Sequence, residues 1–155
     1  FVENALAKAR FASAHTGLAA IADDAGLCVD AFGGLPGVDT AHYCTQFGYD
    51  KSDDNNVRAL LEQMQHQDNR RAALVSTLVA VRSPQDPEPL IAVGRVVGEI
   101  TRERRGSNGF GFDPVMFLPQ LGKTFAQLPT EVKNAYSHRG SASQQMLALL
   151  NERWL

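Results

Sequence analysis

Two long apolar runs separated by a short polar segment constrain the fold of this chain more than any other feature. Residues 72–81 and 90–100 are almost unbroken apolar sequence rich in valine, and the segment SPQDPEP lies between them. Branched side chains favour extended backbone, and prolines and aspartates between two such runs are typical of a turn. The sequence therefore predicts a long β-hairpin, in which Gly94 and Gly98 mark a bulge or a close approach of another backbone.

The rest of the chain reads as helices and short strands. Apolar residues at helical spacing predict a helix already under way at the first residue, a clear helix over residues 52–65, and a final helix that buries Met146, Leu147, Leu150 and Trp154. Strands are expected over residues 18–22 and 115–118, and a short helix over residues 130–136. Glycines and a proline within residues 31–40 predict a loop with little regular structure.

Composition and charge exclude several classes of function. The chain has 155 residues, 44% of them hydrophobic and 21% charged, which is ordinary for one globular domain with its own core. A net charge of −2 supplies no broad positive field and argues against nucleic acid as a partner. No apolar run approaches the ~20 residues of a membrane span, and no signal-peptide pattern is present, so we expect a cytoplasmic protein without a membrane partner.

Two adjacent carboxylates, Asp23 and Asp24, follow the predicted strand over residues 18–22. Neighbouring residues on an extended strand point to opposite faces, so we expect one aspartate to be structural while the other is functional. At the carboxyl end of a strand, the functional carboxylate could hold Mg²⁺ or take a proton from water. Alternatively, the pair caps the backbone of the loop that begins at Ala25.

Glu3 lies on the opening helix and is a second candidate metal ligand. A carboxylate at this position is more often solvated than bound to a metal. Its importance rises if the helix packs beside the strand that carries Asp24, because Mg²⁺ commonly takes only one or two protein carboxylates. Glu3 with Asp24 would form such a set.

The segment GSNGFGFDP combines three glycines, two phenylalanines and an aspartate. An exposed aromatic ring can stack on a nucleobase, and a carboxylate beside it can accept hydrogen bonds from base N–H groups. Phe110, Phe112 and Asp113 therefore form a candidate base-binding segment. The alternative is that both rings are core residues beside a turn.

The segment KNAYSHRG gathers three hydrogen-bond donors at a helix break. Lys133, His138 and Arg139 would suit a carbonyl-bearing base edge or a phosphate. The alternative is a solvated basic corner that complements the carboxyl end of a helix.

Five segments in order, FVENA, ADDAGL, GGLPGV, GFGFDP and SHRG, resemble the inosine triphosphate pyrophosphatase family over nearly the whole chain. The resemblance implies a hydrolase that cleaves ITP, dITP and XTP to the monophosphate and pyrophosphate. It also implies Mg²⁺ as the cofactor and a homodimer as the assembly. Donors facing the six position of the purine would reject adenine, whose amino group there leaves them unpaired.

The resemblance also implies a role for each matching residue. Asp24 would act as proton acceptor and metal ligand, Glu3 would support the metal, and Asp23 would be structural. The implied substrate contacts are Ala25, Phe110, Gly111, Phe112, Asp113, Lys133, His138 and Arg139, with either Phe110 or Phe112 as the stacking ring.

The expected architecture is a mixed α/β fold. We expect a twisted central sheet that contains the long hairpin, helices on its faces, and two lobes with an active cleft, all within a single domain over residues 1–155. Family members begin with a strand and a phosphate-binding loop of the form T/S-x-N-x-x-K, which is absent from this chain, and they usually carry serine where Ala25 stands. We therefore expect the chain to be a fragment or a shortened form.

Two other interpretations remain. The absent loop and Ala25 allow a catalytically impaired member that binds nucleotide or serves as a dimer partner. A Maf-like nucleotide pyrophosphatase would share the general fold, although SHRG and GFGFDP argue against it.

Overall fold

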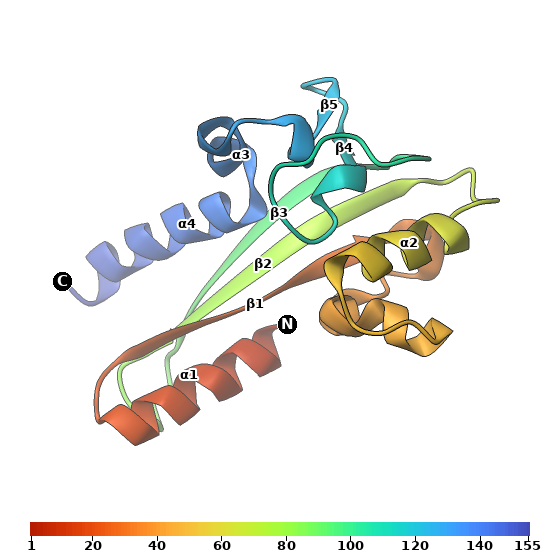
Figure 1. The fold of residues 1–155 in the computed structure, drawn as a ribbon. Helices are drawn as coiled ribbons and strands as arrows, with labels where there is room; N and C mark the ends of the chain where they lie inside the picture. Colours follow the sequence, from red (N-terminus) through yellow and green to blue (C-terminus); the bar gives the residue numbers. More distant parts are fainter. The chain divides into compact units, whose positions relative to one another are not determined.

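The computed structural model describes residues 1–155, and its strands form one five-stranded sheet in the order β1-β2-β3-β4-β5 (Figure 1). The strands are β1 (Ala20–Val29), β2 (Arg71–Val81), β3 (Leu90–Ile100), β4 (Met116–Leu118) and β5 (Lys123–Thr124). The helices are α1 (Val2–Thr16), α2 (Asp53–Gln63), α3 (Thr130–Tyr136) and α4 (His138–Arg153). Short 3₁₀ segments cover Asp30–Phe32, Gly37–Phe47, Asp113–Val115 and Phe125–Gln127. The predicted mixed α/β class is confirmed, with β2 and β3 as the long hairpin.

The chain divides into two compact units. Unit 1 comprises Phe1–Ala25, Val75–Arg95 and Tyr136–Leu155, and unit 2 comprises Gly26–Leu74 and Val96–Ala135. Each unit has its own cluster of buried apolar side chains. The predicted single domain and the predicted cleft stay predictions.

The core of unit 1 lies where α4 packs on β2 and β3. Met146 is buried in a cluster with Ala80, Leu90 and Ala92, and Leu150 and Trp154 pack partly against it. Leu147, which we expected to be buried, is 60% exposed. A helix of 3.6 residues per turn places positions 146 and 150 on one face, whereas the next residue after Met146 is turned about 100° away from that face.

Glycine at position 94 allows α4 to lie directly on β3. A Cβ atom added to Gly94 would collide with the carbonyl oxygen of His138 and lie 2.6 Å from the amide nitrogen of Ala142. The side-chain amide of Gln145 also donates a 2.8 Å hydrogen bond to the carbonyl oxygen of Val93. The predicted close backbone approach in this strand is therefore confirmed.

Small residues bring α1 against the sheet in the same unit. Ala5, Ala9 and Ser13 recur every four residues and are buried, so they form one narrow face of the helix. In Figure 1, α1 and α4 lie on opposite sides of the strands of unit 1. None of the helices in the chain is long and apolar enough to cross a bilayer.

The core of unit 2 surrounds α2. Ser52 caps α2, and its hydroxyl oxygen accepts a 3.0 Å hydrogen bond from the amide of Asn55. The buried side chain of Asn56 accepts from the amide of Cys44 at 2.8 Å and donates to the carbonyl of Ala41 at 3.1 Å. These two bonds hold the 3₁₀ segment Gly37–Phe47 against α2.

Besides the burial of Leu147, two local expectations were wrong. Strand β1 does not end at Asp23 but continues through the acidic pair to Val29. A charge does not end a strand when its side chain reaches solvent, and Asp23 is exposed while Asp24 is only partly buried. The region expected to be a loop contains two 3₁₀ segments, because its glycines lie at turns between regular pieces of backbone.

We predict that Gly94→Ala lowers the free energy of unfolding by about 1–3 kcal/mol, because the new methyl group has no space beside the α4 backbone. Urea unfolding of the two proteins would measure the difference. Ile91→Val, at a 46% exposed site on the same strand, is the control and is expected to change stability by less than about 0.5 kcal/mol. Equal stability of Gly94→Ala and wild type would contradict the packing described here.

A second prediction concerns Asp86 in the turn between β2 and β3. Hydrogen bonds from the amides of Arg82 at 2.8 Å and Glu88 at 2.9 Å hold the pKa of this carboxyl below its usual value of 3.8. A lowered pKa stabilises the fold above the unfolded-state value, and the contribution is lost as the pH falls below 3.8. We expect wild type to be more stable than Asp86→Asn at neutral pH and this difference to shrink at about pH 3, as measured by urea unfolding.

Candidate functional site

The acidic pair lies against α1 in unit 1. The side-chain amide of Asn4 donates a 3.1 Å hydrogen bond to Oδ2 of Asp24. The Nζ atom of Lys8 donates a 2.9 Å hydrogen bond to the main-chain carbonyl of Asp23. Helix α1 therefore packs beside the strand that carries Asp24, which is the condition under which Glu3 becomes a credible metal ligand.

The two aspartates have different surroundings. Asp23 lines a cavity of about 250 Å³ in unit 1 together with Ser76, Arg139 and Ser143. Asp24 is not among the residues that line this cavity, and its contact with Asn4 lies on the α1 side. Because successive strand residues point to opposite faces, Asp23 faces α4 and Asp24 faces α1.

The side chains around Asp24 fit a magnesium ion, which needs few protein ligands, better than a zinc ion, which needs three or four. No group of three or more His, Cys, Asp or Glu side chains that could hold a metal ion is present. A zinc site needs three or four such ligands, whereas Mg²⁺ keeps several waters and takes one or two carboxylates plus phosphate oxygens. Asp24 and the exposed Glu3, next to Asn4, offer carboxylate oxygens of the required kind.

His138 and Arg139 occupy the first turn of α4 in unit 1. Ser137 caps this helix, and its hydroxyl oxygen accepts a 3.0 Å hydrogen bond from the amide of Gly140. The close approach at Gly94 fixes the same turn against β3. His138 and Arg139 therefore lie in a helix turn that is capped by Ser137 and packed against β3.

In unit 2, the carboxylate of Asp113 organises the glycine-rich segment. Its Oδ2 atom accepts a 3.0 Å hydrogen bond from the amide of Phe110 and a 2.6 Å hydrogen bond from Nζ of Lys133. The side chain of Asp113 is only 7% exposed and that of Lys133 is 14% exposed. A buried charge is tolerated when it is paired and hydrogen-bonded, and here each charge neutralises the other.

The two phenylalanines of this segment have opposite environments. Phe110 is 55% exposed, and Nζ of Lys133 lies 4.3 Å from the centre of its ring. Phe112 is buried in the core of unit 2, where its ring meets that of Tyr43 edge to face. Burial raises the pKa of Tyr43 to about 12, so this neighbour of Phe112 is a neutral phenol. Any substrate contact by Phe112 would therefore come from its backbone.

Glycine is required where this segment passes the ion pair. Gly109 has a positive φ of 77°, and a Cβ atom there would collide with Oδ2 of Asp113 and lie 3.2 Å from Nζ of Lys133. A side chain at this position would be strained and would also displace the carboxylate. The glycine content of the segment thus has a specific steric cause.

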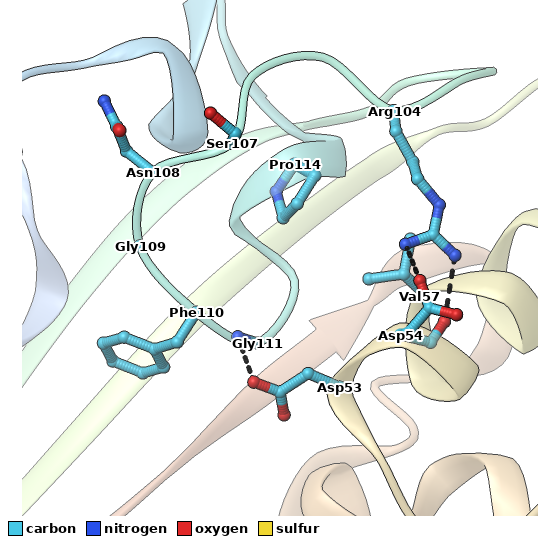
Figure 2. Close-up of a pocket in the computed structure, with 10 residues that line it drawn as sticks. All are labelled: Asp53, Asp54, Val57, Arg104, Ser107, Asn108, Gly109, Phe110, Gly111 and Pro114. Carbon is cyan, nitrogen blue, oxygen red and sulfur yellow. Dashed lines mark hydrogen bonds and ion pairs between the residues drawn. The ribbon is translucent and has the colours of Figure 1, made fainter.

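Sequence reasoning missed the residues on the other side of this segment. A cavity of about 200 Å³ is lined by Asp53, Asp54, Val57, Arg104, Ser107, Asn108, Gly109, Phe110, Gly111 and Pro114 (Figure 2). The amide of Gly111 donates a 2.9 Å hydrogen bond to Oδ2 of Asp53, and the Arg104 guanidinium pairs with Asp54 at 2.7 Å. Aspartates are common in the first turn of any helix, where they complement its positive end. No local signal in the sequence therefore identifies Asp53 and Asp54 as residues that contact the loop.

The predicted site residues therefore fall into two described groups. Phe110, Asp113 and Lys133 are in contact within unit 2. Asp24 and the first turn of α4 belong to unit 1. Ala25 is the last residue of the first segment of unit 1 and is partly buried in β1.

Known proteins are similar to this chain over nearly its whole length. The chain is 82% identical over 155 residues to a protein named dITP/XTP pyrophosphatase from Verminephrobacter eiseniae, with 100% of this chain and 78% of that protein covered. A dITP/XTP pyrophosphatase from Albidiferax ferrireducens is 79% identical over 155 residues, with the same coverage of 100% and 78%.

Solved structures show the same fold. A HAM1 protein from Coxiella burnetii has a TM-score of 0.93 and 41% sequence identity, with 98% of this chain and 77% of that chain covered. A nucleoside-triphosphatase / dITP/XTP pyrophosphatase from Mycobacterium abscessus has a TM-score of 0.79 and 41% identity, with 96% and 74% covered. The Ham1 family itself matches residues 1–149. The chain therefore belongs to the Ham1 family, and the predicted resemblance to inosine triphosphate pyrophosphatases is confirmed.

Proposed function

We propose that this protein hydrolyses dITP, ITP and XTP to the nucleoside monophosphate and pyrophosphate. The observation that carries the proposal is the 82% identity, over the whole chain, to a protein named dITP/XTP pyrophosphatase. An enzyme of this kind removes non-standard purines, those of ITP, dITP and XTP, from the nucleotide pool. The proposal assigns the chemistry of this reaction to residues of the two groups described above.

Asp24 is the proposed proton acceptor. A water molecule attacks the α-phosphorus, a new bond forms between the water oxygen and phosphorus, and the bond to the bridging oxygen breaks, so that pyrophosphate leaves. The proton of the water passes to the carboxylate of Asp24. The hydrogen bond from Asn4 to Oδ2 of Asp24 supports this role, because it holds the carboxylate in one orientation.

Glu3 and Asp24 are the proposed ligands of Mg²⁺. When bound, Mg²⁺ would neutralise charge on the phosphate oxygens and orient them for displacement. The packing of α1 beside β1 supports the assignment, because it brings the first turn of α1, which carries Glu3, next to the strand that carries Asp24. The Nζ atom of Lys8 donates its hydrogen bond to the main-chain carbonyl of Asp23, not to a carboxylate of the pair. Neither carboxylate is therefore held in an ion pair with Lys8.

Phe110 is the proposed stacking platform for the base. Its ring is half exposed and lies under the charge of Lys133, whereas the ring of Phe112 is buried. Stacking on an aromatic ring binds any purine, so selectivity requires polar contacts at the base edge. Lys133, His138 and Arg139 are the proposed donors to the carbonyl at the six position, and adenine would leave such donors unpaired.

The remaining assignments follow the family pattern. We propose that Gly111, Phe112 and Ala25 contact the substrate through their backbones, and that Asp113 acts by holding Lys133 and the amide of Phe110 in place. Ala25 lacks a hydroxyl that could donate to the substrate, which would weaken binding by about 1 kcal/mol for one lost hydrogen bond. A homodimer in the cytoplasm stays a prediction.

The first functional prediction compares the two adjacent aspartates. We expect Asp24→Asn to lower pyrophosphate release from dITP about a hundredfold or more, because the proton acceptor and a metal ligand are lost together. Asp23→Asn, the matched control on the opposite face of β1, is expected to lose no more than about tenfold. Because the curated relatives are longer than this chain, the assay uses the complete gene product with Mg²⁺ and dITP, ITP, XTP, ATP and GTP.

Each outcome of this assay separates the competing interpretations. Turnover of the deaminated purines that fails in Asp24→Asn supports the proposal. Binding of inosine nucleotides without turnover by wild type would identify a catalytically impaired member. A larger loss in Asp23→Asn than in Asp24→Asn would move the proton acceptor to the cavity beside Arg139.

The second functional prediction separates the two phenylalanines. We expect Phe110→Ala to raise KM for dITP about tenfold, because a stacking surface is lost, while stability changes by about 1 kcal/mol or less. Phe112→Ala removes a buried ring and is expected to cost about 3–5 kcal/mol of unfolding free energy. Steady-state kinetics and urea unfolding of both variants test this pair, and unchanged kinetics in Phe110→Ala would rule out the stacking role.

A further inference from the structure

We infer that Asp53, at the amino end of α2, is a positioning residue for base recognition, because it fixes the tip of the loop that presents Phe110. This inference rests on the proposed function. Asp53 lies 58 positions before Gly111, whose amide donates a hydrogen bond to its carboxylate. Asp53 contacts neither Asp24 nor Glu3, the residues that we assign to the reacting phosphates, and it acts through the backbone of Gly111 and the neighbouring ring of Phe110.

Two consecutive amides at the loop tip donate to two different carboxylates. The amide of Phe110 donates to Asp113 at 3.0 Å, and the amide of Gly111 donates to Asp53 at 2.9 Å. Asp113 belongs to the turn that follows the tip, so its bond closes a local structure. Asp53 belongs to α2, so its bond joins the tip to a separate and well-packed element.

These two bonds fix the planes of two successive peptides, one between Gly109 and Phe110 and the other between Phe110 and Gly111, so they lie on either side of the Cα atom that carries the ring. In Figure 2, the amide of Gly111 is directed at the carboxylate of Asp53, and the ring of Phe110 projects away from that carboxylate. A rotation of the tip that broke the bond to Asp53 would also turn the ring. The ring is half exposed and lies 4.3 Å from Nζ of Lys133, so the position of the backbone at the tip decides whether the ring meets that ammonium group.

A second contact ties the beginning of the same loop to α2. The guanidinium of Arg104 pairs with the Asp54 carboxylate at 2.7 Å and donates to the main-chain carbonyl of Asp54 at 3.0 Å. The carboxylates of two successive residues thus hold both ends of the segment between Arg104 and Gly111. Hydrogen bonds from the amides of Arg105 and Asn108 to the carbonyl groups of Pro114 and Ala126 hold the middle of this segment, so the bonds to Asp113 and Asp53 matter most at its tip.

The structure of α2 supports a rigid mounting. Ser52 caps the helix, and Val57 and Leu60 are buried in the core of unit 2. A carboxylate on the first turn of such a helix has a defined position. Ordering a stacking ring before the substrate arrives lowers the entropic cost of binding, so the expected effect of Asp53 is on KM.

The experiment measures kinetics and loop exchange in three variants of the complete gene product. We expect Asp53→Ala to raise KM for dITP about five- to tenfold with kcat within about twofold, because the loop loses one charge-assisted hydrogen bond. Asp53→Asn keeps an acceptor oxygen and is expected to restore most of the affinity. Leu61→Ala removes a partly buried side chain further along α2, away from the loop, so it should lower the melting temperature while KM stays at the wild-type value.

Amide hydrogen exchange over residues 106–112, measured without nucleotide, provides a readout that does not depend on catalysis. We expect faster exchange in Asp53→Ala than in wild type or Leu61→Ala. Wild-type KM or unchanged exchange in Asp53→Ala, in an active wild-type background, would overturn the role of Asp53 alone. Failure of wild type to hydrolyse dITP would instead overturn the proposed function, and with it the positioning role, whatever the exchange shows.

Discussion

The buried carboxylate of Asp113 is the interaction on which the candidate base-binding region of unit 2 depends. It pairs with Lys133 at 2.6 Å and accepts the amide of Phe110 at 3.0 Å, with 7% of its side chain exposed. A buried charge is stable only while its hydrogen-bond and ion-pair partners are present, so the Asp113–Lys133 pair constrains the residues that pack against it. Gly109 must lack a side chain, and the ammonium group of Lys133 comes to lie near the ring of Phe110. The exposed ring and the donor that we propose for the base edge are thus held by one acidic group.

A comparable constraint operates in unit 1, but it is steric. Gly94 allows α4 to touch the backbone of β3, and Ala5 and Ala9 allow α1 to lie close to the strand that carries the acidic pair. Small residues at these contacts set how far the helix ends stand from the sheet. The first turn of α4 and the contact between Asn4 and Asp24 follow from this close packing. The candidate group of unit 1 is therefore supported by backbone and small side chains, whereas an ion pair holds the candidate group of unit 2.

The regular elements could be predicted well because their signals are local. The valine-rich runs gave the hairpin, Ser52 marked the start of α2, and residues 130–136 formed the short helix that was expected. The errors arose where a rule about neighbouring residues in the sequence was used to predict burial, which depends on elements far away in the sequence. Strand β1 continued past two charges because their side chains reach solvent, and Leu147 was exposed because the packing partner of α4 selects one face of the helix. Apolar character alone does not specify which face a neighbour covers.

The sequence by itself determined the residue types and the order of the motifs, and these were sufficient to identify the family and the chemistry of the reaction. Only the tertiary structure decided between Phe110 and Phe112 as the exposed ring, and only it joined Asp53 to Gly111 across 58 positions. The physical reason is that exposure and hydrogen-bond partners belong to pairs of distant elements, whereas propensity and motif spacing belong to a single stretch of chain. A phenylalanine or an aspartate has the same identity in the core, at a helix start or beside a substrate, and its neighbours in space determine which role it has.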